Sequence, residues 1–187
     1  MEVLIMANKK KYIITAITLG VIAATSGAII GLSNLATRDK IAQNELDKIN
    51  NGIVEIFGKN TSINEEFDAN GQKYVVKGYS IKGGETADKR YAFKTTGTNS
   101  YGKITLLIGF EQYANMNTDE FFFVKLSIIV DEQTFSSILE EKYINPLNTE
   151  GESKLSDVDC GATYGAKLVK SMVDEARDYV NANFKNE

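Results

Sequence analysis

Hydrophobic and polar positions divide the chain into a long apolar run, a helical connector and a mixed C-terminal domain. Residues 12–37 form a run of 26 uncharged residues. At about 1.5 Å of rise per residue, a helix of this length covers roughly 39 Å, which exceeds the roughly 30 Å of bilayer hydrocarbon. We therefore predict a transmembrane anchor over 12–37. A cleaved signal peptide is the alternative, although the run is long for one and no Ala-x-Ala cleavage site follows it.

The segment 38–58 has apolar residues at helical spacing. This pattern predicts a stalk helix that leaves the anchor and docks one face on the domain formed by residues 59–187. Gly58 and the polar residues after it are expected to end the helix. The apolar positions are Ile41, Leu46, Ile49, Ile53, Ile56 and Phe57.

Four runs in the C-terminal domain are rich in β-branched and aromatic residues, and clusters of Gly, Asn and Thr separate them. They cover 73–82, 90–96, 103–110 and 121–130. The last two runs are apolar on both faces, which predicts central strands.

The segment after these runs is less regular. Residues 131–143 are expected to form a short helix, and residues 144–157, which include Pro146, are expected to form a loop. The sequence therefore predicts no regular structure between this short helix and the last helix of the chain.

A long amphipathic helix is predicted from about Thr163 to the end of the chain. Its apolar residues fall on one stripe, with charged residues such as Lys170 off the stripe, so the stripe is expected to pack on the sheet. The stripe consists of Leu168, Val169, Met172, Val173, Ala176, Val180 and Phe184. The fold class is thus α+β, a mostly antiparallel sheet packed by a long C-terminal helix.

Charge and composition narrow the function. The formal net charge is −4, and positions 38–187 hold 24 acidic against 18 basic residues, so nucleic acid is a poor partner. With no histidine and one cysteine, Cys160, the chain lacks the usual ligands of zinc, haem and four-cysteine clusters. No metal site is therefore expected, and redox chemistry would need an organic cofactor.

The orientation of the anchor follows from the charges beside it. Lys9–Lys11 precede the run, whereas the charges of residues 38–40 nearly cancel. The positive-inside rule then places residues 1–11 in the cytoplasm and the C-terminal domain outside the cell membrane. Met6, followed by Ala-Asn-Lys, is also a plausible initiator in place of Met1.

The stretch "DVDCGAT" (157–163) stands directly before the C-terminal helix. The first amide groups of a helix lack intrahelical partners and attract anions, phosphate above all. Gly161 and Ala162 allow a ligand close to the backbone. The simpler alternative is that Asp159 or Thr163 only caps the helix.

The wider pattern resembles the FMN-binding domain family. That family includes membrane-anchored flavin subunits of the Rnf electron-transport complex and of the sodium-translocating NADH:quinone reductase. "DVDCGAT" is similar to its flavinylation motif Asp-x-x-(Ser/Thr)-Gly-Ala-Thr. The anchor, the stalk and the motif near the C-terminus match the family's layout, so the resemblance covers nearly the whole chain. A second family feature, Gly-Tyr-x-Gly-x-Ile, is partly matched by Tyr101, Gly102 and Ile104.

The resemblance implies a membrane-anchored electron carrier with a covalent FMN, rather than an independent catalyst. It implies a phosphoester to Thr163, made by a flavin transferase that uses FAD, and other membrane subunits of an electron-transport complex as partners. Asp157 matches the motif aspartate. The cofactor-binding residues expected on this basis are Thr163, Ala162, Gly161, Cys160, Asp157, Tyr164, Tyr101 and Gly102, with the two tyrosines stacking on the flavin.

The chain departs from the family pattern in three places. Cys160 replaces Ser/Thr, Gly165-Ala166 replaces the Thr-Ser that often follows the motif, and "EQTFSS" (132–137) replaces a Glu-Thr-Pro-Gly-x-Gly loop, of which Glu132 remains. A free-standing extracellular flavoprotein and a flavinless surface or pilin-like scaffold are the alternatives. The prepilin signal, a glutamate inside the apolar run, is absent from the sequence.

Overall fold

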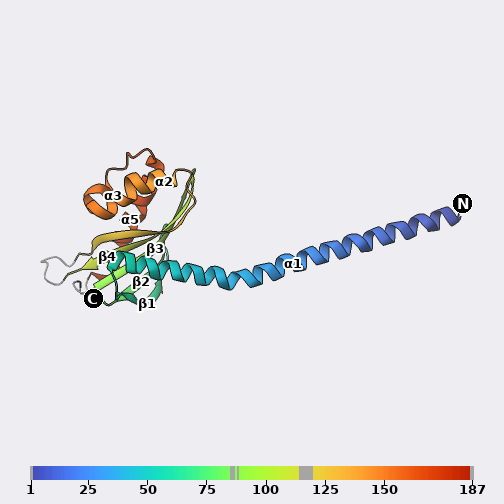
Figure 1. Cartoon of the computed structure of the whole chain (residues 1–187), viewed down its shortest axis with the longest axis horizontal. Coiled ribbons are helices and arrows are strands. Elements are labelled where there is room, and N and C mark those ends of the chain that lie inside the picture. Colours follow the sequence, from blue (N-terminus) through green and yellow to red (C-terminus); the bar gives the residue numbers. More distant parts are fainter. Residues whose placement is uncertain (1, 85–86, 88, 114–119, 186–187) are drawn as a thin grey trace. The chain divides into compact units, whose positions relative to one another are not determined.

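The computed structural model describes residues 2–84, 87, 89–113 and 120–185 (Figure 1). The chain divides into two compact units, Met1–Glu45 and Leu46–Glu187. The second unit, called the C-terminal unit from this point, contains the sheet and all helices after the first. Its composition of an antiparallel sheet and a long terminal helix confirms the predicted α+β class.

Helix α1 (Glu2–Phe57) runs without interruption through the predicted anchor and stalk. Within it, Lys11–Asn34 is long and apolar enough to cross a membrane, and a signal sequence would have the same properties. The apolar side chains of this segment are exposed; Tyr12, for example, is 75% exposed. The helix ends as predicted at Gly58, whose φ of 94° is left-handed and whose amide donates to Val54 O at 2.9 Å.

Five antiparallel strands form one open sheet in which the spatial order follows the chain. The first strand lies in a polar stretch and was not predicted; the other four correspond to the predicted runs. The strands are β1 (Ser62–Asp68), β2 (Val75–Lys82), β3 (Lys89–Asn99), β4 (Gly102–Gln112) and β5 (Phe122–Asp131).

The two faces of the sheet are covered by different helices. Ile49, Ile53 and Ile56 of α1 are buried against one face together with Leu107 of β4. The other face packs on the C-terminal helix through residues such as Ile108. The stalk prediction is thus confirmed for the three isoleucines, but the predicted docking residues Ile41 and Leu46 are 63% and 50% exposed.

Strand β4 is central, as its sequence predicted, but β5 is an edge strand, so the prediction for that run was wrong. The free edge of β5 is covered by side chains from the helices, in the place where a further strand would pair. Asn148 accepts a hydrogen bond from Leu126 N at 2.8 Å and donates one to Leu126 O at 2.9 Å. Glu152 accepts from Phe123 N at 3.2 Å. The strand is apolar on both faces because both are covered: Phe123 and Leu126 belong to the core on the α5 side, and Ile129 belongs to the core on the α1 side.

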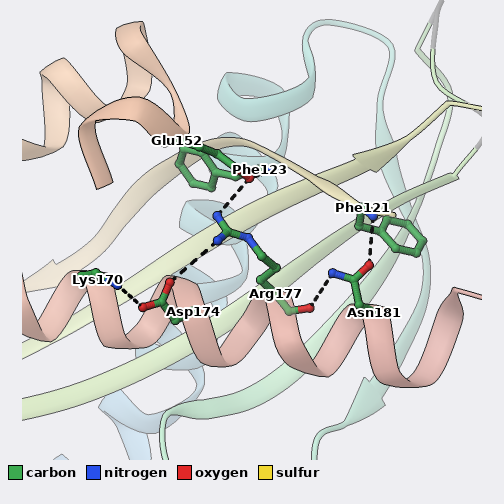
Figure 2. A network of polar contacts seen from close by, with 7 residues as sticks. All are labelled: Phe121, Phe123, Glu152, Lys170, Asp174, Arg177 and Asn181. Atoms are coloured by element: carbon green, nitrogen blue, oxygen red, sulfur yellow. Dashed lines mark hydrogen bonds and ion pairs between the residues drawn. The ribbon is translucent and has the colours of Figure 1, made fainter. Parts of the chain in front are cut away.

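Figure 2 shows the polar network at the start of the same edge. Arg177 lies between Glu152, at 2.9 Å, and Asp174, at 3.8 Å. Asn181 accepts a hydrogen bond from Phe121 N at 3.0 Å and donates one to Arg177 O at 3.1 Å. The network fixes the last helix to the edge of the sheet.

The segment predicted as a loop is helical, so that prediction was wrong. After α2 (Ser136–Leu139) and the π-helix η1 (Glu140–Ile144) come α3 (Asn145–Glu150) and α4 (Glu152–Leu155). Pro146 is the second residue of α3 and directly follows the π-helix η1, where the hydrogen-bond pattern of this continuous helical run changes. Leu147 and Leu155 are buried in the core, which stabilises helices too short to form alone.

The C-terminal helix α5 (Thr163–Phe184) begins where the sequence predicted. Its predicted stripe is confirmed: six of the seven residues are buried, and Phe184 is partly buried against the same core. Gly97 of β3 permits this close packing, since a Cβ at this position would lie 2.7 Å from Leu168 Cδ1. The packing leaves the first turn of α5 beside the turn between β3 and β4.

Candidate functional site

The loop that enters α5 leaves the start of the helix open. Gly161 has a φ of 84°, a conformation that favours glycine, and Ala162 is buried directly before the helix. No side chain among the described residues caps the first turn of α5. The alternative in which Asp159 or Thr163 serves as the helix cap is therefore not observed, and the free amides of the first turn remain open to a ligand.

Thr163, the first residue of α5, is partly buried and its hydroxyl is close to Asp159. Thr163 Oγ1 donates a long hydrogen bond of 3.4 Å to Asp159 Oδ1. Asp157 lies elsewhere, exposed and paired with Lys154 at 2.5 Å. The hydrogen bond and charge of Lys154 hold the pKa of the Asp157 carboxyl below its ordinary value. Asp159 is thus the carboxylate that contacts the threonine hydroxyl.

The second predicted element, the turn of Tyr101 and Gly102, joins β3 to β4. Tyr101 N donates to Asn99 Oδ1 at 2.8 Å, and Tyr101 O accepts from Thr134 N at 2.8 Å. Gly102 has a φ of 135°, and a Cβ there would lie 2.1 Å from Glu132 O. The turn is therefore fixed against the segment that follows β5, and only glycine permits this approach at position 102.

These segments enclose a cavity of about 210 Å³ at the start of α5. It is smaller than the roughly 300–1,000 Å³ of sites that enclose a whole drug-sized ligand, so it suits part of a larger molecule. The cavity brings together the loop, the first turn of α5, the β3–β4 turn and the segment after β5. Its lining residues are Tyr101, Gln133, Phe135, Leu139, Gly161, Ala162, Thr163, Tyr164 and Gly165.

Three exposed aromatic rings surround this cavity. The ring centroid of Tyr101 lies 5.5 Å from that of Phe135 and 5.5 Å from that of Tyr164. Tyr164 is 65% exposed, Phe135 44% and Tyr101 36%. Large exposed aromatic side chains at a cavity provide flat apolar surfaces for a planar ligand.

Five of the eight predicted residues line the cavity: Tyr101, Gly161, Ala162, Thr163 and Tyr164. Gly102 contributes from behind, because its carbonyl accepts a hydrogen bond from Gln133 Nε2. Cys160 is partly buried against the core, and Asp157 is exposed; neither lines the cavity.

Sequence reasoning missed four lining residues: Gln133, Phe135, Leu139 and Gly165. Glu132, the one residue of this segment that matches the family's loop, is exposed and lies outside the lining. Phe135, an aromatic residue in an otherwise polar stretch, was the one available signal. Among the described residues, no group of three acidic or cysteine side chains is placed to hold a metal ion.

Comparison with known protein families finds no matching model, and comparison with curated proteins finds no match either. Function is therefore inferred from the residues of the site.

Proposed function

We propose that this chain is a membrane-anchored electron carrier with a covalent FMN attached to Thr163. The observation that carries the proposal is the cavity at the start of α5. It is lined by both Thr163 and Tyr101, which lie far apart in the sequence and were selected from it independently of the structure.

The residues of the cavity fit the parts of FMN. The phosphate of a phosphoester to Thr163 carries one negative charge, which the uncapped start of α5 can stabilise. Tyr101, Phe135 and Tyr164 offer ring surfaces to the flavin, which would extend beyond the cavity. When bound, FMN supplies one- and two-electron chemistry that the side chains of this protein lack.

Attachment requires a reactive hydroxyl at position 163. In the reaction implied by the resemblance, Thr163 Oγ loses its proton and bonds to the FMN phosphorus of FAD, and AMP leaves. Asp159 Oδ1, the acceptor of the Thr163 hydroxyl hydrogen, is placed to receive that proton. Asp157, exposed on the preceding loop, is available for recognition by the flavin transferase.

The proposed location is the cell membrane, with the C-terminal unit outside. In the first unit, the hydroxyls of Thr15, Thr18 and Thr25 donate to carbonyls four residues earlier, which satisfies them without water. Protease added to intact protoplasts should remove the C-terminal unit. Cleavage that occurs only after lysis would reverse this orientation.

We place the carrier in an Rnf-type ion-translocating complex with other membrane subunits. A free-standing extracellular carrier is the second candidate. It is favoured by Gln133 and Phe135, since the cavity wall that they form departs from the family's Glu-Thr-Pro-Gly loop.

The test of flavin attachment is expression of the full chain with an active flavin transferase, followed by fluorescence of the denatured protein band. The wild type should carry flavin, and Thr163→Ala should carry none. Cys160→Ser, which restores the motif residue, is the control and should be labelled at least as well as the wild type. An unlabelled wild type would leave the scaffold alternative, and a labelled Thr163→Ala would refute the attachment site.

A further inference from the structure

Gln133 is a largely buried residue that presents a polar side chain to the cavity. The residue follows β5, is 7% exposed and lines the cavity beside Gly165. Its Nε2 donates to Gly102 O, and its backbone amide donates to Asp131 Oδ1 at 2.8 Å. The side chain is therefore held in one place between the β3–β4 turn and the first turn of α5.

The hydrogen bond to Gly102 also fixes which end of the carboxamide faces the cavity. A carbonyl oxygen only accepts, so the group bonded to Gly102 O must be the NH₂. The remaining atom, Oε1, can only accept, and no described residue donates to it. Since Gln133 lines the cavity, this oxygen is free to accept a hydrogen bond from a ligand there.

Gly165 keeps this oxygen accessible. A Cβ at position 165 would lie 3.0 Å from Leu139 Cδ2 and 3.5 Å from Gln133 Oε1. A larger residue would therefore crowd the space between Gln133 and the helix. The glycine that departs from the family pattern is thus matched by a carboxamide that supplies a polar group from the opposite wall.

We propose that Gln133 is a positioning residue that accepts a hydrogen bond from the tethered flavin through Oε1. The inference rests on the proposed attachment to Thr163. The donor is either a hydroxyl of the ribityl chain, which leads away from the phosphate, or an N–H of the ring. Gln133 would hold the flavin against the aromatic rings at the cavity.

The matched pair of variants is Gln133→Met and Thr134→Val. Both remove a side-chain hydrogen bond to the β3–β4 turn, since Thr134 Oγ1 donates to Tyr101 O at 3.0 Å. Of these two residues, Gln133 lines the cavity and Thr134 does not. A role in holding the turn would therefore give the two variants similar effects, whereas a bond to the flavin would make Gln133→Met different.

The measurements are time-resolved flavin fluorescence and the midpoint potential of the labelled full chain in detergent. Flavin packed against tyrosine is quenched, and released flavin is long-lived. Gln133→Met should lower the ratio of quenched to released flavin by about two- to tenfold, the effect of one hydrogen bond, while Thr134→Val should resemble the wild type. If the midpoint potential of Gln133→Met also shifts, the donor is a ring N–H. If the potential is unchanged, the donor is a hydroxyl of the ribityl chain.

A further variant controls for misfolding. In Gln133→Glu at acidic pH, a protonated carboxyl can still donate to Gly102 O and accept from the flavin, so wild-type lifetimes should return. Wild-type lifetimes and potential in a folded, labelled Gln133→Met would overturn the inference, as would an equal change in Thr134→Val. A failure of Gln133→Glu to restore the lifetimes would do so too. A wild type that carries no flavin would overturn the proposed function and this inference with it.

Discussion

Replacement of Asn148 by alanine should destabilise the C-terminal unit, because this side chain occupies the place of a sixth strand. Asn148 makes both hydrogen bonds that a neighbouring strand would offer to Leu126, at 2.8 and 2.9 Å. Leu126 is 1% exposed. Asn148→Ala therefore leaves a buried N–H and a buried C=O of the edge strand without protein partners.

The size of the effect depends on how far water can replace the lost partners. Each buried unsatisfied group costs about 1–3 kcal/mol, which sets an upper bound of about 6 kcal/mol. A surface hollow lined by Leu126, Asn145 and Asn148 gives water access to this edge. We therefore expect a loss of about 2–3 kcal/mol, a large part of the roughly 5–15 kcal/mol that stabilises a typical domain.

The assay is urea unfolding of the full chain in detergent, followed by near-ultraviolet circular dichroism of the tyrosines. Thr149→Ala is the control, since its hydroxyl only donates to Asn145 O on the exposed side of the same helix. Its effect should stay within about 0.5 kcal/mol. Hydrogen exchange at the Leu126 amide should also become faster in Asn148→Ala. Unfolding of Asn148→Ala within about 0.5 kcal/mol of the wild type, with unchanged exchange, would refute the claim that this side chain protects the edge.

Two further predictions concern the core. Leu168→Ala, at a buried position of the α5 stripe, should lower the free energy of unfolding by about 2–5 kcal/mol. Lys170→Ala loses only a surface pair with Asp174 and should lower it by under about 1 kcal/mol. Equal losses of the two variants in urea unfolding would contradict the docking of α5. Burial raises the pKa of the Tyr143 phenol, whose hydroxyl donates to Leu155 O at 2.8 Å, so folding favours the neutral form. The stability that this burial contributes should be fully present below the ordinary tyrosine pKa of about 10 and should fall above it. In unfolding measured against pH, Tyr143→Phe should be about 1 kcal/mol less stable than the wild type at neutral pH, but its stability should decline less steeply at alkaline pH.

Elements with a local pattern could be predicted from the sequence. Helix α5 follows from the apolar stripe that runs from Leu168 to Phe184, and β4 follows from a run that is buried on both faces. Strand β1 was missed because most of its residues are exposed and polar. It is held by pairing with β2, where Phe67 covers Gly78 so closely that no Cβ would fit, and this contact between residues distant in sequence leaves no local signal.

The residues of the candidate site also include some that could be predicted from the sequence and some that could not. Thr163 and Tyr101 could be selected from motifs, because each motif is contiguous in the sequence. Gln133 carried no such signal and Phe135 only its aromatic ring in a polar stretch, because the position of both depends on where β5 ends relative to the β3–β4 turn. That position is fixed by tertiary hydrogen bonds from Gln133 and Thr134 to the turn. A cavity built from three separate segments becomes visible only when the sheet register is known.

The polar side of α5 shows a further limit of pattern analysis. Glu175 lies off the apolar stripe, a position that periodicity assigns to solvent. In the structure, however, Glu175 Oε1 accepts hydrogen bonds from Tyr74 N at 2.6 Å and from Val75 N at 3.0 Å, at the start of β2. Because a carboxylate that accepts two amide hydrogen bonds also fixes direction, this contact sets the rotation of α5 over the sheet. The rotation of the helix in turn determines where Thr163 points at its first turn.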